Sequence, residues 1–208
     1  MKTNDEVISR LLKYRNVMQK MTELGFVKCF SDNLADAVGV SPSLVRKDFS
    51  MFNLTGNKRG GYQIAVLLER LNMILGKDKT QNIIIVGCGK MGRALMNYNG
   101  FSRVGIRVTA GFDSEPDLLD PEAPIPIFHV RKMKEYIRKN GIKLAVLTVP
   151  EPSAQPILDT LMKAEIRGVV NFAPIALRGS ESCLIHNINI EQEFEKLFYQ
   201  IQFAEREA

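Results

Sequence analysis

The chain has 208 residues, a hydrophobic content of 45% and a formal net charge of +5, which is enough for one large domain or two small ones. No apolar run reaches the roughly 18 residues that a membrane span needs, and the charged N-terminus does not read as a secretory signal. Three widely spaced cysteines (Cys29, Cys88 and Cys183) suit a reducing cytoplasm and lack metal-ligand spacing, so we expect a cytoplasmic protein with neither a membrane segment nor a metal site.

The first 80 residues carry all of the excess positive charge. They contain 13 Lys or Arg and 8 Asp or Glu, whereas residues 81–208 contain 15 of each kind. A charge excess that is confined to one segment favours a polyanionic partner for that segment alone.

The segment before residue 55 is predicted to contain three helices. Apolar residues recur at helical spacing over residues 5–24, and a shorter helix should follow over residues 31–38. Ser41 is a good N-cap and Pro42 is tolerated in a first turn, so a third helix is expected over residues 42–52. A helix, a glycine turn and a capped helix together form the helix-turn-helix pattern.

The third predicted helix has two different faces. Val45, Phe49 and Phe52 should pack on the first two helices. Short hydroxyls and long cations occupy the opposite face, at Ser43, Arg46, Lys47 and Ser50. Such a face can neutralise phosphates and offer donors to base edges in a major groove, although an ordinary solvated helix can carry the same residues.

A glycine-rich segment over residues 55–62 follows this helix. Two cations at the tip of a hairpin are typical of the wing of a winged helix, where Lys58 and Arg59 would reach phosphates or the minor groove. Cations at loop tips also occur for solubility alone. An amphipathic helix over residues 64–75 and a polar linker complete the first domain, which we assign to residues 1–78.

A dinucleotide-binding fingerprint opens the second domain. Residues 83–86 form a short buried strand that runs directly into Gly87-x-Gly89-x-x-Gly92 and a helical face. Gly87 permits the tight turn, Gly89 lets a pyrophosphate approach the backbone, and Gly92 lets the helix pack closely on the strand. The loop that should contact the ligand comprises Gly87, Cys88, Gly89, Lys90, Met91 and Gly92. Cys88 is expected to be a small side chain beside the cofactor rather than a redox-active thiol.

An acid follows the next predicted strand, as this fingerprint requires. Residues 106–112 should form that strand, and Asp113 ends it, 21 residues beyond Gly92. A carboxylate there accepts hydrogen bonds from both adenosine ribose hydroxyls and repels a 2′-phosphate, which favours NAD(H) over its phosphorylated form.

The remainder of the chain alternates strands and helices. Strands are predicted over residues 125–130, 144–149, 168–172 and 185–190, with helices over residues 132–139 and 153–164. This alternation predicts a parallel, doubly wound Rossmann sheet over residues 79–190, with ligands at the carboxyl ends of its strands. The ends of two strands should therefore flank the cofactor, at Thr148, Val149, Pro150, Asn171 and Pro174.

The last predicted helix, over residues 191–205, carries Phe194, Phe198 and Phe203. These are too many aromatic side chains for a free tail, so the C-terminal region of residues 191–208 should pack on its own domain or on a second subunit. We favour the subunit interface, because operator-binding helix-turn-helix proteins are usually two-fold dimers.

The chain as a whole resembles the bacterial redox-sensing transcriptional repressor family Rex. The blocks that carry the resemblance are Val45-Arg-Lys-Asp-Phe-Ser50, Gly61-Tyr62, the loop Gly87–Leu95, Tyr98, Gly111-Phe-Asp113, Thr148-Val-Pro150, Ala154-Gln155 and Asn171-Phe-Ala-Pro174. Many dehydrogenases share the glycine loop, whereas the Arg-Lys-Asp-Phe-Ser block joined to it is specific.

The resemblance implies a homodimer with an N-terminal winged helix, a Rossmann domain and a C-terminal helix exchanged between subunits. Such a protein senses the ratio of NADH to NAD+ and binds a palindromic operator in double-stranded DNA. NADH closes the dimer, so that its recognition helices no longer match two half-sites. The resemblance further implies that Tyr98 lies near the nicotinamide.

The chain departs from the family pattern at three places, one of which is Asn99, which follows Tyr98 where the family usually has a proline. The wing reads Gly56-Asn-Lys-Arg-Gly-Gly-Tyr62, with Asn57 and Arg59 unusual. The family also has an Asp before the last helix that pairs with an N-terminal arginine of the partner in one state. Here Asn189 holds that position and Arg15 matches the arginine. A paralogue with an altered redox response is therefore an alternative.

Two other functions are alternatives to this one. An NAD-dependent dehydrogenase needs a proton donor, yet neither His129 nor His186 has a carboxylate at an orienting spacing, and no separate substrate domain is visible. A Rossmann interaction module, such as the ligand-sensing domain of a channel regulator, gives no reason for a capped helix with Arg46 and Lys47. We therefore expect a regulator and not an enzyme.

Overall fold

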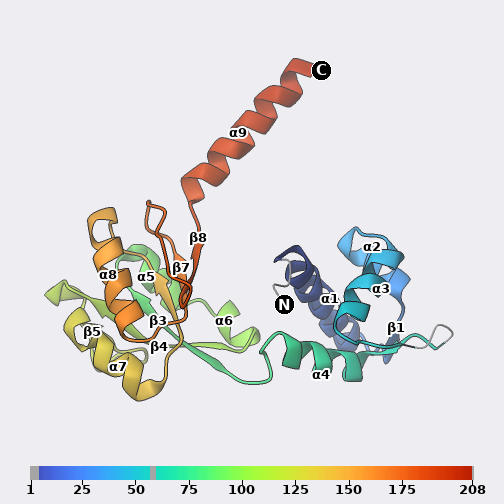
Figure 1. The fold of residues 1–208 in the computed structure, drawn as a ribbon, viewed down its shortest axis with the longest axis horizontal. Helices are drawn as coiled ribbons and strands as arrows, with labels where there is room; N and C mark the ends of the chain where they lie inside the picture. The colour runs from blue at the N-terminus through green and yellow to red at the C-terminus, as the bar shows by residue number, and fades with distance from the viewer. Residues whose placement is uncertain (1–4, 57–59, 208) are drawn as a thin grey trace. The chain divides into compact units, whose positions relative to one another are not determined.

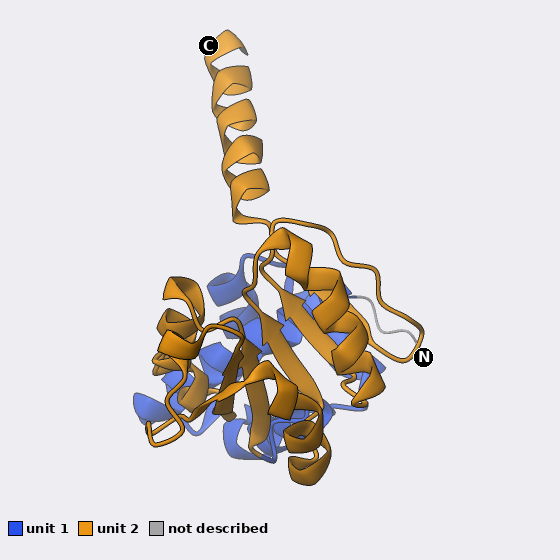
Figure 2. Ribbon diagram, turned by 90° about the vertical axis from the view of Figure 1, so that its left-hand side faces the viewer, with its two compact units in different colours: residues 1–79 blue, residues 80–208 orange. Residues whose placement is uncertain are grey.

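The computed structural model describes residues 5–56 and 60–207. The chain divides into two compact units, residues 1–79 and residues 80–208, which Figure 2 shows in two colours. The division falls one residue beyond the expected end of the first domain. The C-terminal helix belongs to the second unit in this division.

The first unit is built mainly from helices (Figure 1). They are α1 (Asp5–Glu23), α2 (Ser31–Val38), α3 (Pro42–Met51) and α4 (Ile64–Ile74). The turn between α2 and α3 depends on Gly39, whose φ of 75° is a left-handed conformation that favours glycine. The core takes fully buried side chains from all four helices: Leu11, Tyr14, Met18, Leu34, Val45, Phe49 and Leu71.

A short antiparallel ladder connects two distant segments of this unit. β1 (Lys28–Cys29) pairs with β2 (Tyr62–Gln63), with Cys29 opposite Tyr62. The strand after the glycine-rich segment therefore pairs with residues that precede α2. Sequence analysis gave no sign of β1, because two residues carry no periodic pattern. The predicted wing cations Lys58 and Arg59 lie outside the described residues.

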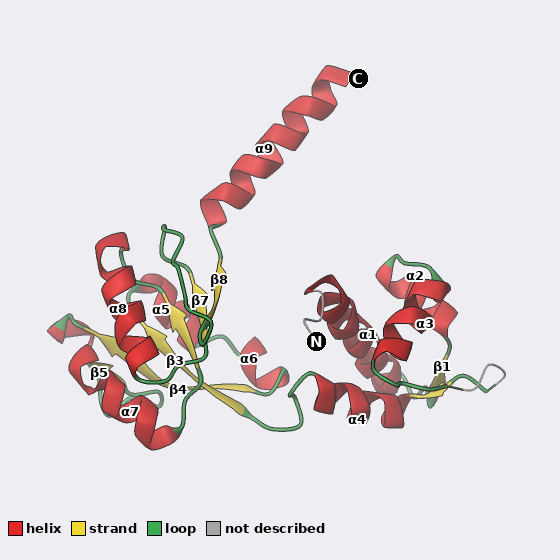
Figure 3. Ribbon diagram, in the orientation of Figure 1, coloured by secondary structure: helices red, strands yellow, loops and turns green. Residues whose placement is uncertain are grey.

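The second unit alternates strands and helices (Figure 3). Its strands are β3 (Gln81–Val86), β4 (Ile106–Asp113), β5 (Ile127–His129), β6 (Leu144–Leu147), β7 (Gly168–Asn171) and β8 (Leu184–Asn187). Its helices are α5 (Lys90–Met96), α6 (Gly100–Arg103), α7 (Met133–Asn140), α8 (Glu151–Lys163) and α9 (Ile190–Glu207), with 3-10 turns η1 (Pro116–Leu118) and η2 (Val130–Lys132).

The six strands of this unit form one parallel sheet in the order β5-β4-β3-β6-β7-β8. The chain builds the sheet outward from β3 in one direction, and then returns to add β6 on the other side of β3. This is the doubly wound Rossmann order that the alternation of elements predicted. The strand order reverses between β3 and β6, so a ligand cleft is expected at the carboxyl ends of these two strands.

Both faces of the sheet are covered by helices. On β3, Ile84 and Val86 point into a core that includes side chains of α7 and α8. Ile83 and Ile85 point into a second core with Met96 of α5 and, at its margin, residues of α6. Because successive side chains of a strand point to opposite faces, a continuous apolar run is what a strand buried on both sides requires.

The C-terminal boundaries differ from the sequence prediction. The apolar residues there predict a strand through Ile190, whereas β8 ends at Asn187 and α9 begins at Ile190. Asn189 accounts for the difference, because its Oδ1 accepts a hydrogen bond from the N–H of Gln192 at 3.0 Å. That bond caps the first turn of α9, and an N-cap outweighs the weak strand preference of the neighbouring isoleucines.

Candidate functional site

The three glycines of the loop after β3 have different surroundings. Gly87 has a φ of +91°, and a Cβ on it would lie 2.5 Å from the carbonyl oxygen of Thr148. A Cβ on Gly92 would overlap the carbonyl oxygen of Gly87. A Cβ on Gly89 would meet nothing within 4 Å. The fold therefore requires glycine at 87 and 92, whereas Gly89 faces open space that a ligand can fill.

Asp113 holds this loop from the end of β4. Its side chain is buried, and its Oδ2 accepts a hydrogen bond from the N–H of Cys88 at 2.5 Å. Its Oδ1 accepts from the N–H groups of Ser114 at 2.7 Å and Glu115 at 3.0 Å. A carboxylate offers about four acceptor positions, so Asp113 retains capacity for a ligand hydroxyl. The carboxylate thus shapes the loop in addition to facing the cleft.

Thr148 joins the end of β6 to the same loop. Its hydroxyl donates to the carbonyl of Gly87 at 2.7 Å, with a longer approach of 3.2 Å to the carbonyl of Val86. Backbone bonds reinforce this link, because the N–H of Thr148 donates to the carbonyl of Val86 at 2.8 Å. The switch point of the sheet is therefore held together by side-chain and backbone bonds.

A cleft of about 520 Å³ opens at this switch point. Several of the residues predicted to contact the cofactor meet there: Gly87, Gly89, Asp113, Thr148, Val149 and Pro150. The remaining walls come from residues that were not predicted as ligand contacts: Val86, Phe112, Ser114, Glu115, Leu118, Val130, Ser153 and Ile157. Ser114 and Glu115 stand just beyond the end of β4 at the carboxyl edge of the sheet, which is the signal that could have found them.

Other predicted ligand residues lie away from these walls. Tyr98 is 59% exposed and lines a separate hollow of about 400 Å³. Lys90 and Pro174 are exposed, and Met91 is half-buried in α5. Asn171 is fully buried, with its amide engaged in bonds within the protein. Their proposed contacts with a ligand therefore remain predictions.

Cys88 is fully buried within the loop. Burial, with a further contribution from the negative charge of Asp113, raises the pKa of its thiol to about 11. A thiol with that pKa is protonated at neutral pH, and the thiolate is the reactive form. The Cys88 side chain is therefore a packing group, and the backbone N–H of Cys88 donates a hydrogen bond to Asp113.

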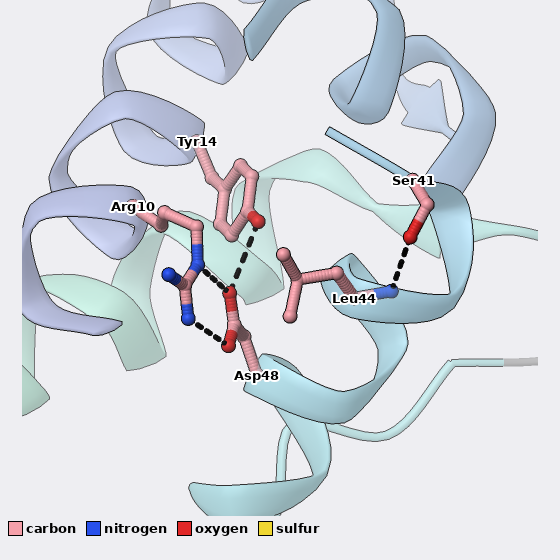
Figure 4. A network of polar contacts seen from close by, with 5 residues as sticks. All are labelled: Arg10, Tyr14, Ser41, Leu44 and Asp48. Carbon is pink, nitrogen blue, oxygen red and sulfur yellow. Dashed lines mark hydrogen bonds and ion pairs between the residues drawn. The ribbon is translucent and has the colours of Figure 1, made fainter. Parts of the chain in front are cut away.

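The recognition candidates lie on α3. Ser41 caps this helix by accepting a hydrogen bond from the N–H of Leu44 at 3.2 Å (Figure 4). Val45 and Phe49 are fully buried on its inner face. All four residues predicted to read DNA are exposed, namely Ser43, Arg46, Lys47 and Ser50. The helix therefore presents hydroxyls and cations together on an accessible surface.

A partly buried ion pair attaches α3 to α1. Asp48 is 1% exposed and accepts two hydrogen bonds from the Arg10 guanidinium, at 2.7 and 2.8 Å. The hydroxyl of Tyr14 also donates to it at 3.1 Å, as Figure 4 shows. This network was not among the sequence predictions, although the i, i+4 spacing of Arg10 and Tyr14 on one helix face was a usable signal.

The same network changes proton affinities within the first unit. The hydrogen bond to Asp48 raises the pKa of the Arg10 guanidinium, so Arg10 is charged at every physiological pH. Burial, followed by the hydrogen bond to Asp48, raises the pKa of Tyr14 to about 12. Arg10 therefore stays charged and Tyr14 stays neutral across the physiological pH range.

Arg15 and Asn189 each have partners within the described chain. Arg15 is 5% exposed, and its Nε donates to Oδ1 of Asn72 at 2.6 Å. Its Nη1 reaches amide oxygens of Gln19 at 3.1 Å and Asn16 at 3.4 Å. Asn189 caps α9 as described above. Neutral amides thus surround the Arg15 cation. The resemblance implies that this cation pairs with a carboxylate of the partner subunit.

Two kinds of feature are absent from the described residues. No three His, Cys, Asp or Glu side chains gather there in a way that could hold a metal ion. In the same part of the chain, no helix has both the length and the apolar character that a membrane crossing demands.

Comparison with known proteins assigns both units to families. Residues 4–50 match the family model described as "Putative DNA-binding protein N-terminus", and residues 78–175 match that of the CoA binding domain. The redox-sensing transcriptional repressor Rex of Listeria welshimeri is 32% identical over 194 residues, which is 93% of this chain and 90% of that protein. The chain belongs to the Rex family of redox-sensing transcriptional repressors.

Solved structures of a Rex-family repressor named RSP agree with this assignment. RSP in complex with β-NAD+ and operator DNA is 29% identical, covers 99% of this chain and 95% of its own, and has a TM-score of 0.93. RSP in complex with β-NADH covers 99% of this chain and 97% of its own, with a TM-score of 0.84. Family membership confirms the predicted fold class and sets aside the dehydrogenase alternative, because the Rex relatives are repressors.

Proposed function

We propose that this chain represses transcription as a homodimer whose operator binding falls when NADH replaces NAD+. One observation carries the proposal. A single chain combines a capped helix with exposed Arg46 and Lys47 and a cleft formed by a dinucleotide loop and Asp113. The RSP complexes with operator DNA, NAD+ and NADH support the same pairing of ligands. Its place of action is the cytoplasm, where DNA and the nicotinamide pool are both present.

The DNA-binding face is assigned to α3. Arg46 and Lys47 neutralise phosphates or donate to guanine edges, and Ser43 and Ser50 reach the backbone or bases. Arg46 donates to the hydroxyl of Ser31 at 2.9 Å in the free protein, so this neutral partner leaves its charge available to DNA. Lys58 and Arg59 are proposed to add contacts from the wing.

The dinucleotide is assigned to the cleft at the switch point. Its pyrophosphate lies over Gly89, where the space is open, and its adenosine ribose reaches Asp113. NADH and NAD+ differ by a hydride and by the positive charge of the nicotinamide ring. Discrimination between them therefore arises around the ring, at the end of the ligand away from Asp113, where the resemblance places Tyr98.

Repression requires that the two ligands favour different dimer geometries. A ligand shifts an equilibrium only by its difference in affinity for the two states. A hundredfold difference corresponds to about 2.7 kcal/mol, which lies within the usual range of coupling between sites. The C-terminal helix α9 is proposed to exchange between subunits and so to connect the ligand with the spacing of the two α3 helices.

The test uses a palindromic duplex that the protein itself selects from a random-sequence pool. We expect NADH to dissolve the complex at a concentration at which NAD+ does not, as measured by fluorescence anisotropy at fixed salt. Replacing Arg46 and Lys47 together by Ala should weaken duplex binding by about tenfold or more and leave NADH affinity unchanged. Retention of the duplex by this variant at physiological salt would show that α3 is not the reading helix.

A family member with an altered redox response is the second candidate. Asn189 favours it, because a neutral amide cannot form the ion pair with Arg15 that the resemblance implies. In that case NADH binds the cleft, as calorimetry would record, but the duplex complex survives at saturating NADH. The same two measurements on the unmodified protein separate the candidates.

A further inference from the structure

The end of β7 is joined to the root of α9 by a network of amide groups. The Nδ2 of buried Asn171 donates one hydrogen bond to the carbonyl of Ile175 at 2.8 Å and one to Oδ1 of Asn187 at 2.9 Å. Its Oδ1 accepts from the N–H of Ala173 at 3.0 Å. Both donor hydrogens of Asn171 are therefore used inside the protein, which makes it a poor ligand for a cofactor.

Asn187 completes this network from the neighbouring strand. It stands opposite Asn171 in the β7–β8 ladder, and its Oδ1 accepts a second hydrogen bond from the N–H of Leu177 at 3.0 Å. The N–H of Ile188 donates to the carbonyl of Asn171 at 2.8 Å. The next residue, Asn189, is the cap of α9. The amide pair thus fixes the backbone from which α9 departs.

The network also reaches the dinucleotide cleft. Phe172, which follows Asn171, donates its N–H to the carbonyl of Leu147 at 2.8 Å. Thr148 follows Leu147, and its hydroxyl holds the carbonyl of Gly87 at 2.7 Å. An unbroken series of hydrogen bonds and single-residue steps therefore links the glycine loop to the first turn of α9.

We propose that Asn171 and Asn187 are positioning residues that transmit the state of the dinucleotide cleft to α9. This inference rests on the proposed function, because it names the route by which NADH changes the dimer. A displacement of the cleft rim breaks or re-forms the Asn171–Asn187 bond, which gives the root of α9 two discrete arrangements.

The position of the far end of α9 is sensitive to small changes at the beginning of the helix. Every residue of α9 from Ile190 to Arg206 is exposed, so the sheet supports the helix mainly at its beginning. A helix of 18 residues is about 27 Å long, and a tilt of about 10° at its root moves its far end by about 5 Å. Small changes at the amide pair are therefore amplified where α9 meets a partner.

The alternative route through Arg15 and Asn189 is less suited to this chain. The Oδ1 of Asn189 is occupied by the cap of α9, and Arg15 is surrounded by amide oxygens of its own unit. Asn189 carries no charge, so it cannot form with Arg15 the ion pair on which such a switch depends. The amide pair provides a connection that needs no charge.

The test compares two substitutions at Asn187, which is exposed and therefore tolerant of change. Asn187→Ala removes the acceptor shared by Asn171 and Leu177, whereas Asn187→Asp retains it. His186→Ala is the matched control, because His186 is exposed on the same strand and takes no part in these bonds. For each dimer, NADH affinity is measured by calorimetry without DNA, and duplex affinity by anisotropy with and without NADH.

We expect Asn187→Ala to bind NADH with the same affinity as the unmodified protein. In the absence of NADH, it should also bind the duplex with unchanged affinity. The loss of duplex affinity that NADH causes should shrink by about fivefold or more. Asn187→Asp and His186→Ala should keep the full NADH response. An undiminished response in Asn187→Ala, or a response in Asn187→Asp as weak as in Asn187→Ala, overturns the proposal.

Hydrogen exchange on the unmodified protein gives a readout that does not depend on any variant. NADH should change the exchange rates of the Leu177 and Ile188 amides more than those of the interior of β6. Unchanged rates at both amides during an intact NADH response would contradict the coupling while leaving the proposed function in place. Failure of the unmodified protein to release the duplex with NADH would instead reject the proposed function itself.

Discussion

At the residue scale, Gly89 and Gly92 belong to the same loop but serve different purposes. Gly92 allows the helix to approach the carbonyl of Gly87, whereas Gly89 has φ −66° and open space around it. Gly92 is therefore a requirement of the fold, whereas the fold does not require glycine at position 89, which we propose serves ligand binding. The distinction between them is physical, because a methyl group meets protein at one position and only a ligand at the other.

Substitution of these glycines by Ala separates the two purposes. Gly89→Ala should leave the melting temperature unchanged and weaken NADH binding by about tenfold or more, since a methyl group then occupies the phosphate approach. Gly92→Ala should lower stability by about 1–3 kcal/mol through overpacking against backbone. Scanning calorimetry with and without NADH measures both effects. Equal loss of stability in the two variants would contradict these assignments.

The cysteines give a prediction that depends on pH. All three are buried, and burial raises the pKa of Cys29 and of Cys88 to about 11. A raised pKa favours the thiol in the folded protein, so thiolate forms only as pH rises toward that value. We expect the native protein to react slowly with a disulfide reagent at pH 7 and faster above pH 10, and the unfolded chain to react at once. Rapid native reaction at pH 7 would show that a thiol is accessible.

At the element scale, the orientation of α3 depends on a tether to α1. The bidentate contact between Arg10 and Asp48 crosses 38 residues of sequence, and the hydroxyl of Tyr14 adds a third bond to the same carboxylate. These bonds give Asp48, the one acid of the Arg-Lys-Asp block, its partners inside the first unit. The two cations of the block, Arg46 and Lys47, remain exposed on the surface. The tether therefore helps to determine which face of α3 is exposed, and that is the face proposed to contact DNA.

Removing one partner of this ion pair should be worse than removing both. Arg10→Met leaves a buried carboxylate without its cation, and we expect a loss of about 3 kcal/mol of stability in the first unit. The double variant Arg10→Met with Asp48→Leu should recover most of that loss, because no buried charge remains. Hydrogen exchange of the α3 amides measures the stability of this unit in the full chain. A double variant as unstable as the single one would indicate that the pair determines more than charge balance.

At the scale of the whole molecule, α9 supplies an apolar surface that the described chain leaves open. Phe194 is 58% exposed, Leu197 is 52% exposed and Phe198 is 63% exposed. Exposed apolar patches of this kind mark interaction sites, and a two-fold dimer is what a palindromic operator requires. The proposed occupant of this surface is a second copy of the chain.

Charge on that surface should therefore abolish assembly without unfolding the subunit. Leu197→Glu combined with Phe198→Glu is expected to give monomers in sedimentation velocity and to reduce duplex affinity by about a hundredfold or more, because one half-site alone then holds the protein. Glu195→Lys, an exposed change on the same helix, serves as the control for altered charge. Persistence of the dimer in the double variant would place the interface elsewhere.

Local patterns in the sequence were sufficient for several of these conclusions. The glycine loop, the acid after the second strand of the sheet and the capped helix with Arg46 are each contained in a short stretch. Their spacing reflects the periodicity of one strand or helix, so it can be read from the chain alone. The alternation of elements likewise predicted a parallel, doubly wound sheet. Family membership confirms that fold class.

Only the tertiary structure decided which distant residues meet. The pairing of Asp48 with Arg10, of β1 with β2, and of Asn171 with Asn187 joins residues that are far apart in sequence. Such contacts leave no periodic pattern in the sequence, because each depends on how whole elements pack. The sequence alone thus predicted the two proposed binding elements and the residue types that each contains. The folded chain decided how each is held, since buried polar groups must find partners wherever packing brings them.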